Sequence, residues 1–80
     1  HASECETRAT PASDGWRLES GTAVERVDVY DAQGRLLQSV NGNGETGLWI
    51  NAAGLPEGVF AARVFGDGKI RCGRLVKRRG

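Results

Sequence analysis

The chain has 80 residues and a formal net charge of +1, so it is long enough for one domain and too short for two. No apolar run approaches the roughly 18 residues of a membrane span, and with one histidine, His1, the sequence gives almost no support for a histidine-based triad or metal site. Twelve glycines against two prolines predict many tight turns around a thin core.

Two regions differ in composition. Residues 1–14 are small, polar and charged without strand or helix periodicity, which predicts a linker whose His1 is a tag remnant. The N-terminus lacks a basic start followed by an apolar core, so we expect the chain to be a piece of a larger protein. Ordered structure is expected over residues 15–80.

Short runs of alternating apolar and polar residues predict six or seven β-strands and no helix. The runs cover residues 16–18, 24–30, 35–40, 48–50, 59–65 and 69–77. Turn-forming residues separate them at Asp31–Gly34, Asn41–Gly44, Leu55–Gly58 and Gly66–Gly68. This spacing predicts an all-β, antiparallel sandwich, with a small barrel as the second choice.

The alternation also assigns the buried faces. Val27 and Val29 share one face of their strand, and Phe60 lies on the apolar face of residues 59–65. In the last strand Ile70 and Cys72 share a face and Leu75 is out of phase with them, which predicts a β-bulge near residues 73–74.

Charge is divided unevenly along the chain. Residues 1–62 carry a net charge of −5 and residues 63–80 a net charge of +6. The basic residues near the last hairpin are Arg63, Lys69, Arg71, Arg74 and Lys77. Either these contact a partner, or they are solvated charges that protect an edge strand from aggregation. With Phe65 as the only exposed aromatic expected nearby, we expect no nucleic-acid partner.

Two cysteines, Cys5 and Cys72, form an even pair. In an oxidising compartment they could bridge the linker to the last strand, and closing so long a loop would stabilise the fold by roughly 4 kcal/mol. The alternative is two unrelated thiols, with Cys72 a small buried hydrophobe.

The sequence offers little chemistry for catalysis. It has no nucleophile–base pair and no cofactor motif, and Gly42–Gly47 lacks the Lys-Ser/Thr ending of a phosphate loop. We therefore expect no enzymatic activity, no cofactor and no metal.

Three sequence runs carry a resemblance. They are VERVDVYDAQGRLL (Val24–Leu37), LWINAAGLPEGVFAARV (Leu48–Val64) and GDGKIRCGRLVKRRG (Gly66–Gly80). Together, in this order, they resemble the C-terminal sorting domain of cargo proteins of the type IX secretion system, which belongs to Bacteroidetes-type bacteria with two membranes.

The resemblance implies a seven-stranded immunoglobulin-like sandwich that acts as a secretion signal without catalysis. A folded cargo domain upstream would cross the periplasm and then the outer membrane, to be secreted or held at the cell surface. The implied partners are the translocon, an outer-membrane shuttle protein and a sortase-like protease, which usually removes the domain. Some members of the family instead remain uncleaved as surface components of the secretion machinery.

The resemblance also assigns residues. Those on its turn and motif blocks are Pro56, Gly58, Phe60 and Gly68, and those expected to be recognised by the export machinery are Lys69, Leu75, Val76, Lys77 and Arg78. An exposed edge strand could also pair with a partner or with a second copy. An accessory immunoglobulin-like domain is the alternative function: it would bind carbohydrate through Trp16 or Trp49, or pack on a catalytic domain.

Overall fold

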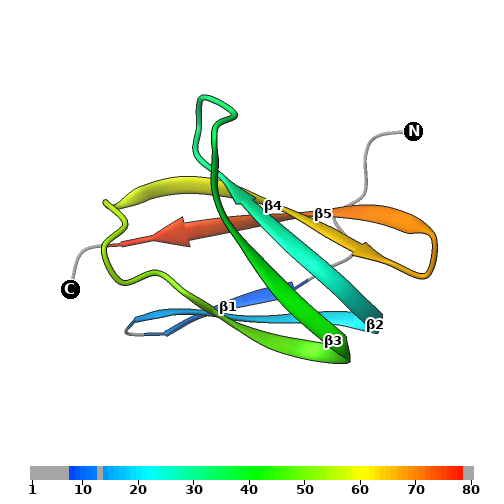
Figure 1. The fold of residues 1–80 in the computed structure, drawn as a ribbon. Helices are drawn as coiled ribbons and strands as arrows, with labels where there is room; N and C mark the ends of the chain where they lie inside the picture. The colour runs from blue at the N-terminus through cyan, green and yellow to red at the C-terminus, as the bar shows by residue number, and fades with distance from the viewer. Residues whose placement is uncertain (1–7, 13, 79–80) are drawn as a thin grey trace.

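In the computed structural model, which describes residues 8–12 and 14–78, the regular structure is one curled antiparallel β-sheet (Figure 1). Its five strands are β1 (Arg8–Ala12), β2 (Gly15–Tyr30), β3 (Leu36–Asn51), β4 (Gly58–Gly66) and β5 (Lys69–Lys77). The sheet order is β1-β2-β4-β5, and β3 also pairs with β2. No helix within the described residues has the length and apolarity to cross a membrane.

The all-β, antiparallel fold is confirmed, but six or seven separate strands are not. Residues 16–18 and 24–30, predicted as two strands, belong to the single strand β2. Residues 35–40 and 48–50 were likewise predicted to be separate, whereas β3 runs without interruption from Leu36 to Asn51. Periodicity finds the regular halves of each strand and misses the irregular middle that joins them.

Strand β2 bends in its middle. Glu19 pairs with Gly47 and Val24 pairs with Glu45, so residues 20–23 of β2 lie opposite Thr46 alone. Extra residues on one strand bend it and increase its local twist. Before the bend β2 pairs with β1 and β3, and after the bend it pairs with β3 and β4.

Two glycines sit against this bend. Gly42 of β3 is buried, and a methyl group there would overlap the carbonyl oxygen of Val24. Gly66 of β4 is also buried, and a methyl group there would overlap the carbonyl oxygen of Ala23. The backbones of β3 and β4 therefore approach β2 at its bend more closely than any residue with a Cβ allows.

The turn predicted at Asn41–Gly44 is wrong. Asn43 and Gly44 do have positive φ, at 53° and 77°, as the residue types indicate, but they lie within β3. There they follow the bend of β2 instead of reversing the chain.

The turns between β2 and β3 and between β4 and β5 lie at the residues that the sequence predicts. The amide of Gly34 donates to the carbonyl oxygen of Asp31 at 3.0 Å. Asp67 and Gly68 have φ of 55° and 69°, the two positive values of a two-residue turn that suits a twisted hairpin. The turn predicted at Leu55–Gly58 lies earlier in the chain, because the amide of Leu55 donates to the carbonyl oxygen of Ala52.

Strand β1 is a correction to the predicted linker. Residues 8–12 pair with β2 from Arg8 opposite Glu19 to Ala12 opposite Gly15, and Ala9 packs against the core. Backbone hydrogen bonds to β2 hold this strand in place. They require no alternation of apolar residues, so periodicity does not predict the strand. The rest of the predicted linker that lies in residues 1–7, with His1, is outside the described residues.

The core lies inside the curl of the sheet. Trp16, Leu18, Val27 and Val29 of β2 are at most 1% exposed, so the predicted buried face of this strand is confirmed. The other buried apolar residues are Val24, Ile50, Ala52, Phe60, Ala62, Val64 and Leu75. Each half of β2 contributes to this one cluster because the bend turns the two halves toward each other.

The bend gives a testable prediction for stability. Gly66→Ala should lower the free energy of unfolding by about 1–3 kcal/mol, the usual cost of overpacking a tight site, as measured by urea unfolding followed by tryptophan fluorescence. Gly47→Ala is the matched control, because its Cβ would meet the nearest atom at 3.7 Å. Equal stability of the two variants would contradict this account of the bend.

Candidate functional site

The candidate site is the C-terminal strand, because the residues expected to be recognised lie on it. β5 pairs with β4 in an unbroken register from Gly58 opposite Lys77 to Gly66 opposite Lys69, so the predicted bulge is wrong. Leu75 is fully buried and Ile70 is 63% exposed. The predicted phase was therefore reversed: Leu75 marks the buried face, while Ile70 lies at the hairpin end on the outer one.

Two expected recognition residues hold the fold together. Leu75 is in the core cluster. The carbonyl oxygen of Val76 accepts a 2.9 Å hydrogen bond from the buried indole of Trp16. That indole also packs on Phe60, with ring centroids 5.9 Å apart. The side chain of Leu75 and the backbone of Val76 therefore anchor β5 to the opposite end of the chain.

Lys77, expected to be recognised by the export machinery, also has a role inside the fold. Its ammonium donates to the carbonyl oxygens of Ala52 at 2.8 Å and Leu55 at 2.6 Å. The side chain is partly buried, and it satisfies two acceptors in the connection between β3 and β4. Lys77 thus ties the end of β5 to this connection.

Lys69 and Arg78 remain exposed. They lie at opposite ends of β5, at the hairpin and just beyond its last residue. Among the expected recognition residues, these two present their side chains most openly to a partner.

The motif residues shape the backbone around β5. Phe60 is buried, as predicted, and Gly68 forms the hairpin turn. Gly58 begins β4 with a φ of 149°, a conformation that favours glycine. Pro56 is exposed in the connection before it.

The predicted disulfide stays a prediction, because Cys5 lies outside the described residues. Cys72 is partly buried on β5, opposite Arg63 of β4.

Two arginines on the outer face of the sheet lie over aromatic rings. The guanidinium of Arg26 is 4.2 Å from the ring centre of Phe65, and that of Arg63 is 5.3 Å from that of Tyr30. Such contacts are favourable because the face of the ring attracts the cation. Alternation places Arg26 and Tyr30 on the outer face, but their aromatic contacts depend on which strands become neighbours.

Asp28 of β2 is a buried acid on the same outer face of the sheet. It is 6% exposed and accepts hydrogen bonds from Arg26 at 3.1 and 3.3 Å and from Ser39 at 2.7 Å. Its charge is therefore compensated by Arg26. Arg63 and Arg74 leave the outer face of β4 and β5 with a positive surplus.

An apolar groove lies beside this positive surface. It is open, has a volume of about 350 Å³, and runs between the β2–β3 turn and the β4–β5 pair. The lining residues are Asp31, Ala32, Val59, Phe60, Ala61, Cys72, Gly73 and Arg74.

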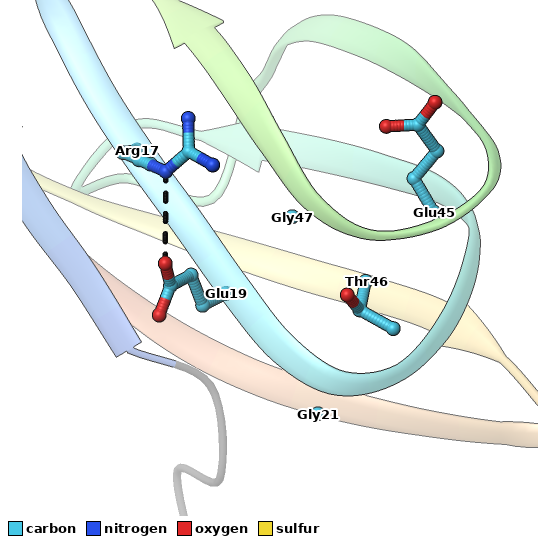
Figure 2. Close-up of a pocket in the computed structure, with 6 residues that line it drawn as sticks. All are labelled: Arg17, Glu19, Gly21, Glu45, Thr46 and Gly47. Carbon is cyan, nitrogen blue, oxygen red and sulfur yellow. Dashed lines mark ion pairs between the residues drawn. The ribbon is translucent and has the colours of Figure 1, made fainter.

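A second, polar depression lies where β2 and β3 separate at the bend (Figure 2). Arg17 and Glu19 form an ion pair of 3.6 Å on β2, and Glu45 projects from the facing part of β3 (Figure 2). This pair is exposed and contributes little to stability. Within residues 8–12 and 14–78, no three metal-ligating side chains gather at one place.

Comparison with known proteins gives no family: no protein-family model matches the chain, and no curated protein matches it.

The contacts of Lys77 give a prediction. Lys77→Met keeps most of the aliphatic stem but removes the ammonium donor from the carbonyl oxygens of Ala52 and Leu55, of which, among the described residues, only that of Ala52 keeps another donor, the Leu55 amide. We expect the free energy of unfolding to fall by about 1–3 kcal/mol, measured by urea unfolding. Lys69→Met makes the same change at an exposed site and should cost less than about 0.5 kcal/mol. A similar loss in both variants would argue against a specific role of Lys77.

The groove rim carries Asp31, an acid whose pKa is shifted. Its pKa lies below its ordinary value, chiefly because the backbone amide of Arg35 donates to the carboxylate, with further donation from the Arg35 side chain and the amide of Gln33, against an opposing effect of desolvation. A lowered pKa in the folded state stabilises the fold above the unfolded pKa, and this stabilisation disappears as pH falls through the folded pKa.

Asp31→Asn tests this linkage, because it keeps an acceptor at the turn and removes the charge. The variant should be less stable than the wild type at pH 7, and the gap should close as the pH falls from about 5 to about 2. Urea unfolding at several pH values measures the gap. A gap that stays constant over this range would contradict the role of the charge.

Proposed function

We propose that the chain is a non-catalytic secretion signal that directs an upstream cargo across an outer membrane through the type IX system. The observation that carries the proposal is the ordered set of three motif runs, from Val24 to Gly80. The all-β fold supports it, since the first run spans the turn between β2 and β3, the second contains most of β4, and the third contains all of β5.

The proposal includes a finer description of the fold. The two halves of β2 pair with different neighbours, β1 before the bend and β4 after it, and the two halves of β3 pair with opposite halves of β2. Counted as halves, they give the seven segments of the immunoglobulin-like sandwich that the resemblance implies. In this description the two layers share β2 and β3, instead of being joined by loops.

In this proposal the export machinery recognises the folded surface of the domain. Because Leu75 and Lys77 hold β5 in place, their loss would destroy the shape of the signal along with any direct contact. Lys69 and Arg78 are exposed and are the residues we assign to direct contact. The proposed sequence of events places the domain in the periplasm during transit and then at the cell surface, where a sortase-like protease removes it.

A carbohydrate-binding accessory domain is the second candidate. Trp16 is buried and unsuited to this role, but Trp49 is 46% exposed. Trp49 lines a polar depression with Arg17, Asn41 and Glu45, and an exposed indole beside polar groups can stack on a sugar.

Surface export of a reporter tests the first candidate. The 80-residue chain, fused to the C-terminus of a fluorescent protein, should reach the surface of a type IX-competent host and stay in the periplasm of a translocon-deficient strain. Lys69→Glu with Arg78→Glu should reduce the surface signal about tenfold or more, because charge reversal opposes recognition, while circular dichroism of the purified chain stays unchanged.

Two controls complete the experiment. Arg17→Glu reverses a charge of similar exposure on β2, and Trp49→Ala removes the exposed indole; both fusions should export normally. Retention of the wild-type fusion in the periplasm of the competent host would overturn the proposal. Glycan binding that disappears with Trp49→Ala would then favour the second candidate.

A further inference from the structure

We infer that the apolar groove between the β2–β3 turn and the β4–β5 pair binds an extended peptide with aliphatic and acidic side chains on the same face, two residues apart. This inference is independent of the export role. It rests on the juxtaposition of an exposed apolar floor with a positively charged rim.

The floor of the groove is apolar and open to solvent. Val59 is 47% exposed, and Ala61 beside it is exposed as well. Both point away from the core, because the alternate residues Phe60 and Ala62 fill it. The groove volume of about 350 Å³ lies at the low end of the range for ligand sites, about 300–1,000 Å³.

The rim carries uncompensated positive charge. Arg74 lies directly opposite Ala61 in the β4–β5 register and makes no ion pair within the described residues. Arg63 lies over Tyr30 two positions along β4. The acid on the rim, Asp31, is already paired with Arg35 at 3.1 Å. A ligand with negative charge therefore meets the guanidinium of Arg74 at the rim, with Arg63 farther along the same outer face.

The same geometry favours a peptide over a nucleic acid or a polysaccharide. Bases and sugars bind by stacking on open aromatic faces, but guanidinium groups cover the rings of Tyr30 and Phe65. The floor instead offers aliphatic surface, which a leucine or valine side chain can cover. In an extended peptide, residues two apart point to the same side. A carboxylate two residues from the aliphatic side chain would then reach the guanidinium of Arg74, which can bind it in a bidentate manner.

The test is a titration of the ¹⁵N-labelled 80-residue chain with acetyl-Leu-Ser-Glu-Ser-Val-Ser-Glu-amide, followed by NMR. Its Leu, Glu and Val side chains lie on one face when the peptide is extended. Amide shifts should concentrate at Ala61, Arg74 and Ala32, with saturation below about 1 mM peptide. Arg74→Glu should weaken binding about tenfold, the effect of roughly 1.4 kcal/mol. Arg17→Glu, the same change on β2, should leave the affinity unaltered, and well-dispersed spectra of both variants establish that they fold.

Three results would overturn the inference. The first is the absence of saturable shifts at these amides up to about 2 mM peptide. The second is an equal loss of affinity in Arg74→Glu and Arg17→Glu, which would indicate unspecific charge attraction. The third is binding of oligo-dT or a heparin fragment at the same amides and at lower concentration than the peptide, which would make the groove a site for another class of polymer. A peptide with Ser for Leu and Val should bind more weakly than the parent, because the floor then stays uncovered.

Discussion

The bend of β2 is the constraint on which the rest of the structure depends. At this point Gly42 of β3 and Gly66 of β4 lie against the backbone of residues 23–24, where no side chain would fit. The bend turns the two halves of β2 toward each other, so that Trp16 from one half and Val29 from the other belong to one core. Without it a sheet of this length would leave its apolar face in water.

The bend also decides what the C-terminal strand does. Curling of the sheet brings the indole of Trp16 to the carbonyl of Val76, although the two residues lie at opposite ends of the chain. The same closure lets Lys77 reach the carbonyl oxygens before β4. Strand β5, expected to be recognised by a partner, therefore also closes the fold. Substitutions in β5 can affect both recognition and stability.

Surface chemistry separates into regions with different character. The outer face of β4 and β5 combines an aliphatic floor with the charge of Arg74. The polar depression near the bend combines the acids Glu19 and Glu45 with Arg17 (Figure 2). Part of the basic group is used internally, since Lys77 and Arg71 donate to groups of the fold.

Much of the local structure could be predicted from the sequence. Asp31 and Gly34 form the predicted turn, Asp67 and Gly68 form the predicted hairpin, and the alternation around Val27 and Phe60 identifies buried faces. These features depend on backbone preferences and on a two-residue period, both of which are set by residues close together in the sequence. The predicted phase of the last strand is wrong because Ile70, which set it, lies exposed at the end of its hairpin.

The sequence by itself determined the β class, the hairpin turns and most of the core. The tertiary structure alone decided that four predicted strands are two, that residues 8–12 join the sheet, and that Val76 and Lys77 bind distant parts of the chain. The physical reason is that these outcomes depend on backbone carbonyls and on close approaches at glycine. Every residue carries the same carbonyl, so the side-chain pattern cannot show which of them will meet a donor from elsewhere in the fold.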